Sequence, residues 1–439
     1  MKDNFYKLLD SLSSELNANE VLLAQYYGEV SDFVRFNHAK VRQAGAVEDH
    51  SVYLTLFKNK KVVSASVNLT SNFEEDFTSG KYLLEQLKAN VENAPEDPYF
   101  KFNEVAGEEI SLETLADLPS TEKMTADIVE LAEGLDLVGV LAKGDIYRGF
   151  ASSIGHRKFV KRCNFNFDFA CYLNKDKAVK SSYSGMSWKP SEIKEKLEDA
   201  KTKIEVLKKP VKSLSPGKYK TYFTPAALEE IISMMNWGGF SKKSIETKSS
   251  PLNHLVTGAK NFSDKVTFTQ NTAKGFAATF DGHGFDLPTN VSLIENGKFK
   301  SALSSSRSSA EYGCEINADG EYFSALEMKE GDLPSSDVLK TLDSGLYVSN
   351  LWYTNFSDRA SGKITGMTRF ATFWVENGEI SSPVNVMRFD DSLFEIFGSK
   401  LEAVTKEREF TLDAGTYEMR STSSMLLPGI IVKDFELTL

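Results

Sequence analysis

Cysteine and histidine are scarce in this 439-residue sequence, and glycine-rich nucleotide-binding motifs are missing. Its three cysteines cannot form a disulfide framework. No GxGxxG or Walker A pattern occurs, so nucleotide binding is not supported. A helical metal motif places two imidazoles one turn apart, and the histidines are too widely spaced for that. The five histidines are His38, His50, His156, His254 and His283.

Positive charge and long apolar runs are also lacking. The net charge is −11 and the isoelectric point about 5.2, whereas sequence-independent binding to nucleic acid needs a basic surface. No apolar stretch approaches the length of a membrane span. Acidic residues interrupt positions 1–30, which argues against a signal peptide. We therefore expect a cytoplasmic protein that contacts neither nucleic acid nor membrane.

The first half of the sequence alternates between helix-like and strand-like patterns. The clearest strand is 163–173, where apolar residues occupy one side and Asn164, Asn166 and Asp168 the other. This alternation predicts an antiparallel sheet with one solvated face. The apolar spacing also predicts helices over 4–17, from about 83 to 91 and over 121–134, and strands over 20–27, 32–44, 51–57 and 61–69.

A break near residue 210 divides the sequence. A charged helix over 191–209 is followed by Pro210 and by Ser215-Pro216-Gly217, which interrupt regular structure. We therefore predict two domains, 1–212 and 213–439. Strand signals dominate the second, and two strands are expected between 416 and 439. Tight hairpins are predicted at Asn296-Gly297, Asp319-Gly320 and Asn377-Gly378.

The predicted fold class is α+β. We expect an N-terminal α/β region with an antiparallel sheet, followed by a mainly antiparallel β domain that carries a few helices. Within the second domain, Lys218 to Phe223 alternates like a strand, Thr224 suits a helix cap and Pro225 suits the first helical position. The helix that follows offers Glu229 and Glu230 but no histidine.

Four segments carry a resemblance to a known family. They are Arg35–Val41, Phe280–Thr289, Ile294–Phe299 and Phe373–Ile380, in this order along the chain. They are similar to the RFANSRI, FDDEGVPT, LIENGVL and WIENGEI segments of the TldD/PmbA family, also described as modulator of DNA gyrase or peptidase U62. Gly282-His283-Gly284 departs from the usual acidic turn of that family.

The resemblance implies a place in a metallopeptidase. In TldD-type subunits the helix that corresponds to 225–237 carries a HExxxH zinc motif, whose histidines bind the metal and whose glutamate can activate water. The absence of that motif implies the other subunit type, PmbA (TldE). We therefore expect no metal and no cofactor in this chain, zinc in a TldD-like partner, and unfolded or modified peptides as substrates.

A second hypothesis is an autonomous non-metal hydrolase. His283 lies near Asp281 and Asp286 in the sequence, and a carboxylate can orient an imidazole for acid–base chemistry. Cys314 could supply a nucleophile. These residues would have to meet in one pocket.

A third hypothesis is a non-enzymatic binding protein that forms a homodimer. Arg307, in a serine-rich segment, and Arg369, before an apolar strand, are candidates for contact with a substrate or partner. The size of the assembly in solution separates this hypothesis from a pairing with a TldD-like subunit.

Overall fold

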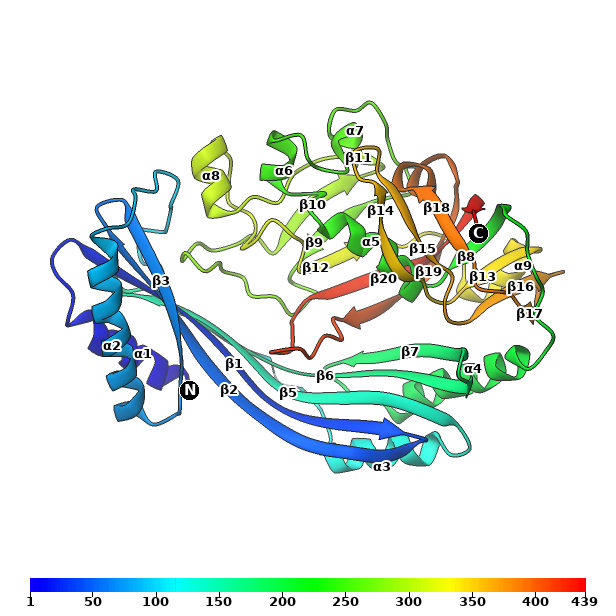
Figure 1. The fold of residues 1–439 in the computed structure, drawn as a ribbon, viewed down its shortest axis with the longest axis horizontal. Helices are drawn as coiled ribbons and strands as arrows, with labels where there is room; N and C mark the ends of the chain where they lie inside the picture. The colour runs from blue at the N-terminus through cyan, green and yellow to red at the C-terminus, as the bar shows by residue number, and fades with distance from the viewer. Residues whose placement is uncertain (115) are drawn as a thin grey trace.

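The computed structural model describes residues 1–114 and 116–439, which contain two β-sheets (Figure 1). The first sheet has the strand order β3-β2-β1-β5-β6-β4, with β7 also paired to β6. Its strands are β1 (Glu20–Asn37), β2 (Lys40–Lys58), β3 (Lys61–Asn68), β4 (Ile110–Thr114), β5 (Asp136–Ser152), β6 (Arg157–Asn174) and β7 (Lys177–Gly185). In Figure 1, β1, β2, β5 and β6 form a long curved band beneath the second sheet.

The first hairpin is longer than the sequence pattern predicts. The strands expected at 20–27 and 32–44 are instead the continuous β1 and the beginning of β2. The chain reverses at His38 and Ala39, whose φ angles are 52° and 53°. Asn and Gly usually occupy such left-handed positions because they adopt them at least cost. No local signal therefore marks this turn.

Helices cover the first sheet at both ends (Figure 1). At one end, α1 (Lys2–Ser13) and α2 (Phe73–Val91) pack on each other and on β1, β2 and β3. At the other, α3 (Thr121–Leu131) and α4 (Pro190–Leu207) cover the apolar side of β6. Phe165, Phe167 and Phe169 are buried there, as the alternation predicts.

Part of the polar side of β6 is buried, contrary to the prediction of a sheet with one solvated face. Asn164 and Asn166 are 0% and 6% exposed because the C-terminal half covers them. The Asn166 Nδ2 group donates hydrogen bonds to two backbone carbonyls of residues 412 and 413. The Arg420 backbone N–H donates to Glu29 Oε2 at 2.9 Å. Buried polar contacts thus join the two halves.

The second sheet has the main order β11-β10-β9-β12-β20-β8-β13-β16-β17. Most neighbours are antiparallel, while β12–β20 and β8–β13 are parallel. Its strands are β8 (Gly217–Phe223), β9 (Phe268–Asn271), β10 (Asn290–Glu295), β11 (Lys298–Phe299), β12 (Ala325–Met328), β13 (Gly345–Val348), β14 (Trp352–Asp358), β15 (Lys363–Met367), β16 (Thr372–Glu376), β17 (Glu379–Pro383), β18 (Arg388–Ser392), β19 (Leu401–Leu412) and β20 (Ser424–Leu437).

Short helices accompany this sheet, so the predicted α+β class is confirmed. They are α5 (Pro225–Ser233), α6 (Lys242–Glu246), α7 (Asn253–Val256), α8 (Ser306–Tyr312) and α9 (Val338–Leu342). No helix in the described residues has the length and apolar character needed to cross a membrane. The boundary expected at 212/213 falls between α4 and β8; the division into domains stays a prediction.

Two of the three expected hairpins are confirmed. Asn296-Gly297 joins β10 to β11 and Asn377-Gly378 joins β16 to β17, with positive φ at all four residues. The hairpin predicted at Asp319-Gly320 is wrong, because these residues lie in a loop before β12. The two strands expected between 416 and 439 are also wrong: β20 alone forms there, and residues 416–423 carry the contact of Arg420 with the first sheet.

Candidate functional site

The strand β8 and helix α5 form as their residues predict. The Thr224 hydroxyl accepts a hydrogen bond from the Ala227 backbone N–H at 3.2 Å, which caps α5. Thr224 also donates to the Ser349 carbonyl at 2.7 Å, which ties the cap to the end of β13. Leu228 and Ile231 point into the core of the second sheet. The opposite side of α5 is therefore free to carry polar residues.

Glu229 and Glu230 line a cavity of about 400 Å³ on that opposite side, which we call the α5 cleft. Asp168 and Lys180, from β6 and β7, form the wall contributed by the first sheet. Residues 411–415 and Asn350 are also part of the lining. Both halves of the chain thus contribute polar groups to one cleft.

Carboxylates dominate the electrostatics of the α5 cleft. Burial raises the pKa of Glu229 to about 7, and the neighbouring charge of Glu230 adds to this effect. Burial also raises the pKa values of Glu230 and Asp168, while the ammonium of Lys180 opposes both shifts. Lys180 Nζ lies 3.6 Å from Asp168 Oδ1. Burial therefore keeps Glu229 protonated to a higher pH than an exposed glutamate, and a carboxyl group in that form can donate a hydrogen bond to a ligand.

His283 lies against a serine and an aromatic ring. Its Nδ1 atom is 3.1 Å from Ser306 Oγ, and its ring meets Phe100 edge-on. Asp281 Oδ1 accepts the backbone N–H of His283 instead of contacting its ring. Asp286 pairs with Lys158 Nζ at 2.5 Å. Neither Asp281 nor Asp286 therefore forms the expected carboxylate–imidazole pair with His283.

Asp281 stabilises the turn that carries His283. Its Oδ1 atom accepts N–H groups from His283 and Phe285 at 3.0 and 2.8 Å, while Oδ2 is buried without a partner in the described chain. Burial raises the pKa of Asp281 to about 7 and lowers the pKa of His283. Cys314 Sγ lies 3.6 Å from the Ser308 carbonyl on α8, and within the described residues no hydrogen bond joins it to His283. These groups do not form the hydrolase site that the second hypothesis requires.

The two candidate arginines have different surroundings. Arg307 Nη1 pairs with Asp97 Oδ2 at 2.7 Å, which ties α8 to the connector before β4. Arg369 lies 4.7 Å from the centre of the Trp352 ring, in a cation–π contact at the start of β14. Arg307 is thus engaged within the chain, whereas Arg369 belongs to an aromatic surface.

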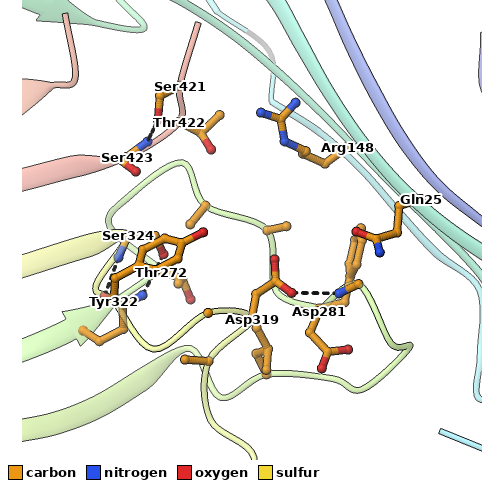
Figure 2. Close-up of a pocket in the computed structure, with 18 of the residues that line it drawn as sticks. Gln25, Arg148, Thr272, Asp281, Asp319, Tyr322, Ser324, Ser421, Thr422 and Ser423 are labelled. Carbon is orange, nitrogen blue, oxygen red and sulfur yellow. Dashed lines mark hydrogen bonds between the residues drawn. The ribbon is translucent and has the colours of Figure 1, made fainter. Parts of the chain in front are cut away.

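A second cavity lies between the two sheets, which we call the Arg148 pocket (Figure 2). Its volume is about 230 Å³. Arg148 and Gln25 project from β5 and β1, while Asp319 and the 421–423 segment approach from the C-terminal half (Figure 2). Gly282 permits this approach, because a Cβ atom there would come within 2.4 Å of Gln25 Oε1. The sequence contains no local sign of this pocket, since its walls are distant in the chain.

A comparison with protein families decides the relationship of this chain. The model of the PmbA/TldA metallopeptidase C-terminal domain matches residues 216–439. The chain belongs to the TldD/PmbA family. A search of curated proteins found no match for it.

Solved structures share the fold of this family member over its whole length. TldE from Thermococcus kodakarensis has 15% identity and a TM-score of 0.76, covering 99% of this chain and 100% of that one. A protein assigned as a modulator of a DNA gyrase, from Thermotoga maritima, has 16% identity and a TM-score of 0.77, with coverage of 99% and 100%. A third, assigned as a modulator of DNA gyrase from Bacteroides thetaiotaomicron, has 17% identity and a TM-score of 0.76, with coverage of 100% and 98%.

Zinc does not fit the donor set that this family member offers in the α5 cleft. Protein zinc sites mostly rely on histidine nitrogen or cysteine sulfur, with carboxylates as a minority. The cleft offers Glu229, Glu230 and Asp168, and the ammonium of Lys180 neighbours the last of these. Across residues 1–114 and 116–439, no three His, Cys, Asp or Glu side chains cluster closely enough to hold a metal ion.

Proposed function

We propose that this chain is a PmbA/TldE-like subunit, or a paralogue of one, in a peptidase whose zinc chemistry lies in a TldD-like partner. The observation that carries the proposal is the chemistry of the α5 cleft, where Glu229 and Glu230 stand on the helix and no histidine does. Membership of a metallopeptidase family supports the link to peptide hydrolysis. The chain then contributes binding surfaces, and the partner activates water.

An open strand beside the cleft supports contact with an extended peptide or a partner. β14 pairs with β15 and with no other described strand, so its outer edge offers unpaired backbone groups. Trp352 and Tyr353 on this strand are 44% and 75% exposed. The Thr354 hydroxyl lies 3.5 Å from Glu230 Oε2, which places β14 next to α5. Addition of a strand at such an edge is a common mode of peptide recognition.

The same edge is compatible with the homodimeric binding protein of the third hypothesis. Two copies of β14 could pair through their free edges, because an unpaired strand accepts any suitable backbone. Sedimentation of the pure chain, with and without a TldD-like subunit, separates the two assemblies. A stable homodimer that excludes the TldD-like subunit would favour the binding protein.

The direct test is reconstitution. The purified chain, a TldD-like subunit and their mixture are each incubated with an unstructured peptide, and cleavage is followed by mass spectrometry. We expect cleavage to require the TldD-like subunit and to be inhibited by a zinc chelator. Full activity of this chain alone would reject the proposed division of roles.

A further inference from the structure

We propose that the Arg148 pocket binds the carboxylate end of a small zwitterionic ligand, either a free α-amino acid or the end of a short peptide. The inference does not rest on the proposed subunit role, because it concerns binding by this chain alone. It starts from a partly buried guanidinium, that of Arg148, which forms no ion pair with a carboxylate of the described chain. Within the described residues, the charges of Glu29 and Asp319 act on Arg148, but neither carboxylate forms an ion pair with it.

Most of the donors of Arg148 are free. Its Nη1 atom donates to the Tyr147 carbonyl at 2.8 Å and lies 3.6 Å from Met419 Sδ. The guanidinium also stacks on Tyr27, 4.9 Å from the ring centre. The Nε and Nη2 groups have no protein acceptor in the part of the chain that the structure describes. Stacking and one hydrogen bond therefore fix the orientation of the guanidinium and leave one edge open to the pocket.

Arg420, a buried arginine, differs from Arg148 because protein acceptors surround its guanidinium. Arg420 Nη1 donates to Ser31 Oγ at 2.9 Å, and Nη2 donates to the Asn164 carbonyl and side chain. Its donors are therefore satisfied by the fold, as buried charges usually require. The open edge of Arg148 matches the fork of a carboxylate, which can accept two parallel hydrogen bonds.

The rest of the lining favours a carboxylate over a phosphate. Asp319 lies on the facing wall, where its Oδ1 atom accepts the Gly282 N–H at 2.8 Å (Figure 2). Its negative charge would repel a dianion but would attract the ammonium of an amino acid. The hydroxyls of Thr422 and Ser423 face the same space and can donate to an oxyanion. A zwitterion complements both walls, because its carboxylate can pair with Arg148 and its ammonium with Asp319.

The size of the cavity sets the size of the ligand. Pockets for drug-sized molecules measure roughly 300–1,000 Å³, and the Arg148 pocket is smaller, at about 230 Å³. Asp319 is exposed at its rim, so a longer chain could leave the pocket past this residue. A single amino acid or the last residue of a peptide therefore fits best.

Isothermal titration calorimetry of the full chain tests the proposal with L-alanyl-L-alanine, its C-terminal amide, its N-acetyl form, L-alanine and inorganic phosphate. We expect the free dipeptide to bind at least tenfold more tightly than its amide, which lacks the carboxylate, and phosphate not to compete with it. The N-acetyl form should bind several-fold more weakly. If L-alanine binds as tightly as the dipeptide, the ligand is a free amino acid. If L-alanine binds more weakly, the ligand is the end of a peptide.

Variants locate the binding. Arg148→Gln should weaken dipeptide binding at least tenfold, Arg148→Lys should retain part of it, and Asp319→Asn should remove the preference for a free ammonium. Arg388→Gln is the matched control, because Arg388 is an exposed arginine that pairs with Asp390 on β18. Equal binding of the acid and the amide by the unaltered chain would overturn the proposal, as would no binding of any carboxylate-terminated probe at about 10 mM. That comparison holds even if Arg148→Gln fails to fold.

Discussion

At the scale of single residues, burial raises the pKa values of carboxyl groups in this chain. Glu229 in the α5 cleft and Asp281 in the turn before His283 both have pKa values raised to about 7 by burial. Surface carboxyls titrate near 4, so these two groups keep their protons at a pH where others have lost them. Such groups mark functional clefts but also make stability depend on pH.

Glu229→Gln should remove part of that pH dependence. In the folded chain Glu229 holds its proton up to about pH 7, whereas in the unfolded chain it loses it near its ordinary value. The folded state thus binds more protons between these values, and the stability of the unaltered chain falls as pH rises through this window. We expect the variant to gain about 2 kcal/mol relative to the unaltered chain between about pH 5 and about pH 8.

Urea denaturation at the two pH values measures this difference. Glu376→Gln is the control, since Glu376 is an exposed glutamate at the end of β16. Parallel stability curves for the unaltered chain and Glu229→Gln would show that Glu229 ionises as freely in the folded chain as in the unfolded one.

At the scale of secondary structure, local signals explain what the sequence could predict. The Thr224 cap, Pro225 and the apolar spacing of α5 are neighbours in the chain, so β8 and α5 were predictable. The turn at His38 and Ala39 was not, because both residues adopt left-handed φ angles under the control of the long β1–β2 pairing. Asp319-Gly320 resembles a hairpin turn locally, yet no strand precedes it.

Thr224→Ala should destabilise the chain through α5. The substitution removes the cap on Ala227 and the hydrogen bond to the Ser349 carbonyl. Loss of a helix cap costs about 1 kcal/mol, and the second hydrogen bond adds a similar amount. Thr224→Ser keeps the hydroxyl and should remain within a few tenths of a kcal/mol of the unaltered chain. Equal midpoints of urea unfolding for the two variants would contradict this account.

Trp352→Lys tests the open edge of β14. A lysine on an edge strand disfavours the addition of another strand, and the change removes an exposed aromatic ring. We expect at least tenfold weaker association with a TldD-like subunit, measured by calorimetry, and only a small fall in the melting temperature from loss of the cation–π contact with Arg369. Tyr82→Lys on α2 is the control, as Tyr82 is 65% exposed on the N-terminal helices. If both substitutions weakened the association equally, β14 would not be part of the interface.

At the scale of the whole molecule, the two sheets are joined by polar groups that are buried on both sides. Glu29 and Arg420 are 1% and 4% exposed, and neither strand pattern nor composition indicates that they meet. The same contact brings residues 421–423 to β5 and so forms the Arg148 pocket. Both cavities depend on this long-range arrangement, which explains why their walls could not be derived from the sequence.

Arg420→Met should weaken the contact between the two sheets. It would remove the guanidinium that donates to the Asn164 side chain and attracts the buried Glu29 carboxylate, whereas the backbone N–H bond to Glu29 would remain. Removing one partner of a buried charge costs roughly 3 kcal/mol or more. Thermal unfolding should show a lower midpoint, partly restored by adding Glu29→Gln, while Arg388→Met should have little effect. A midpoint unchanged by Arg420→Met would show that apolar packing alone holds the sheets together.

The central claim is that this family member cannot hold a catalytic zinc ion with its own side chains. Metal analysis of the freshly purified chain, beside a peptidase assay on an unstructured peptide, tests it most directly. The account predicts far less than one zinc per chain and no cleavage until a TldD-like subunit is added. One zinc per chain at full occupancy, with cleavage by the chain alone, would contradict it.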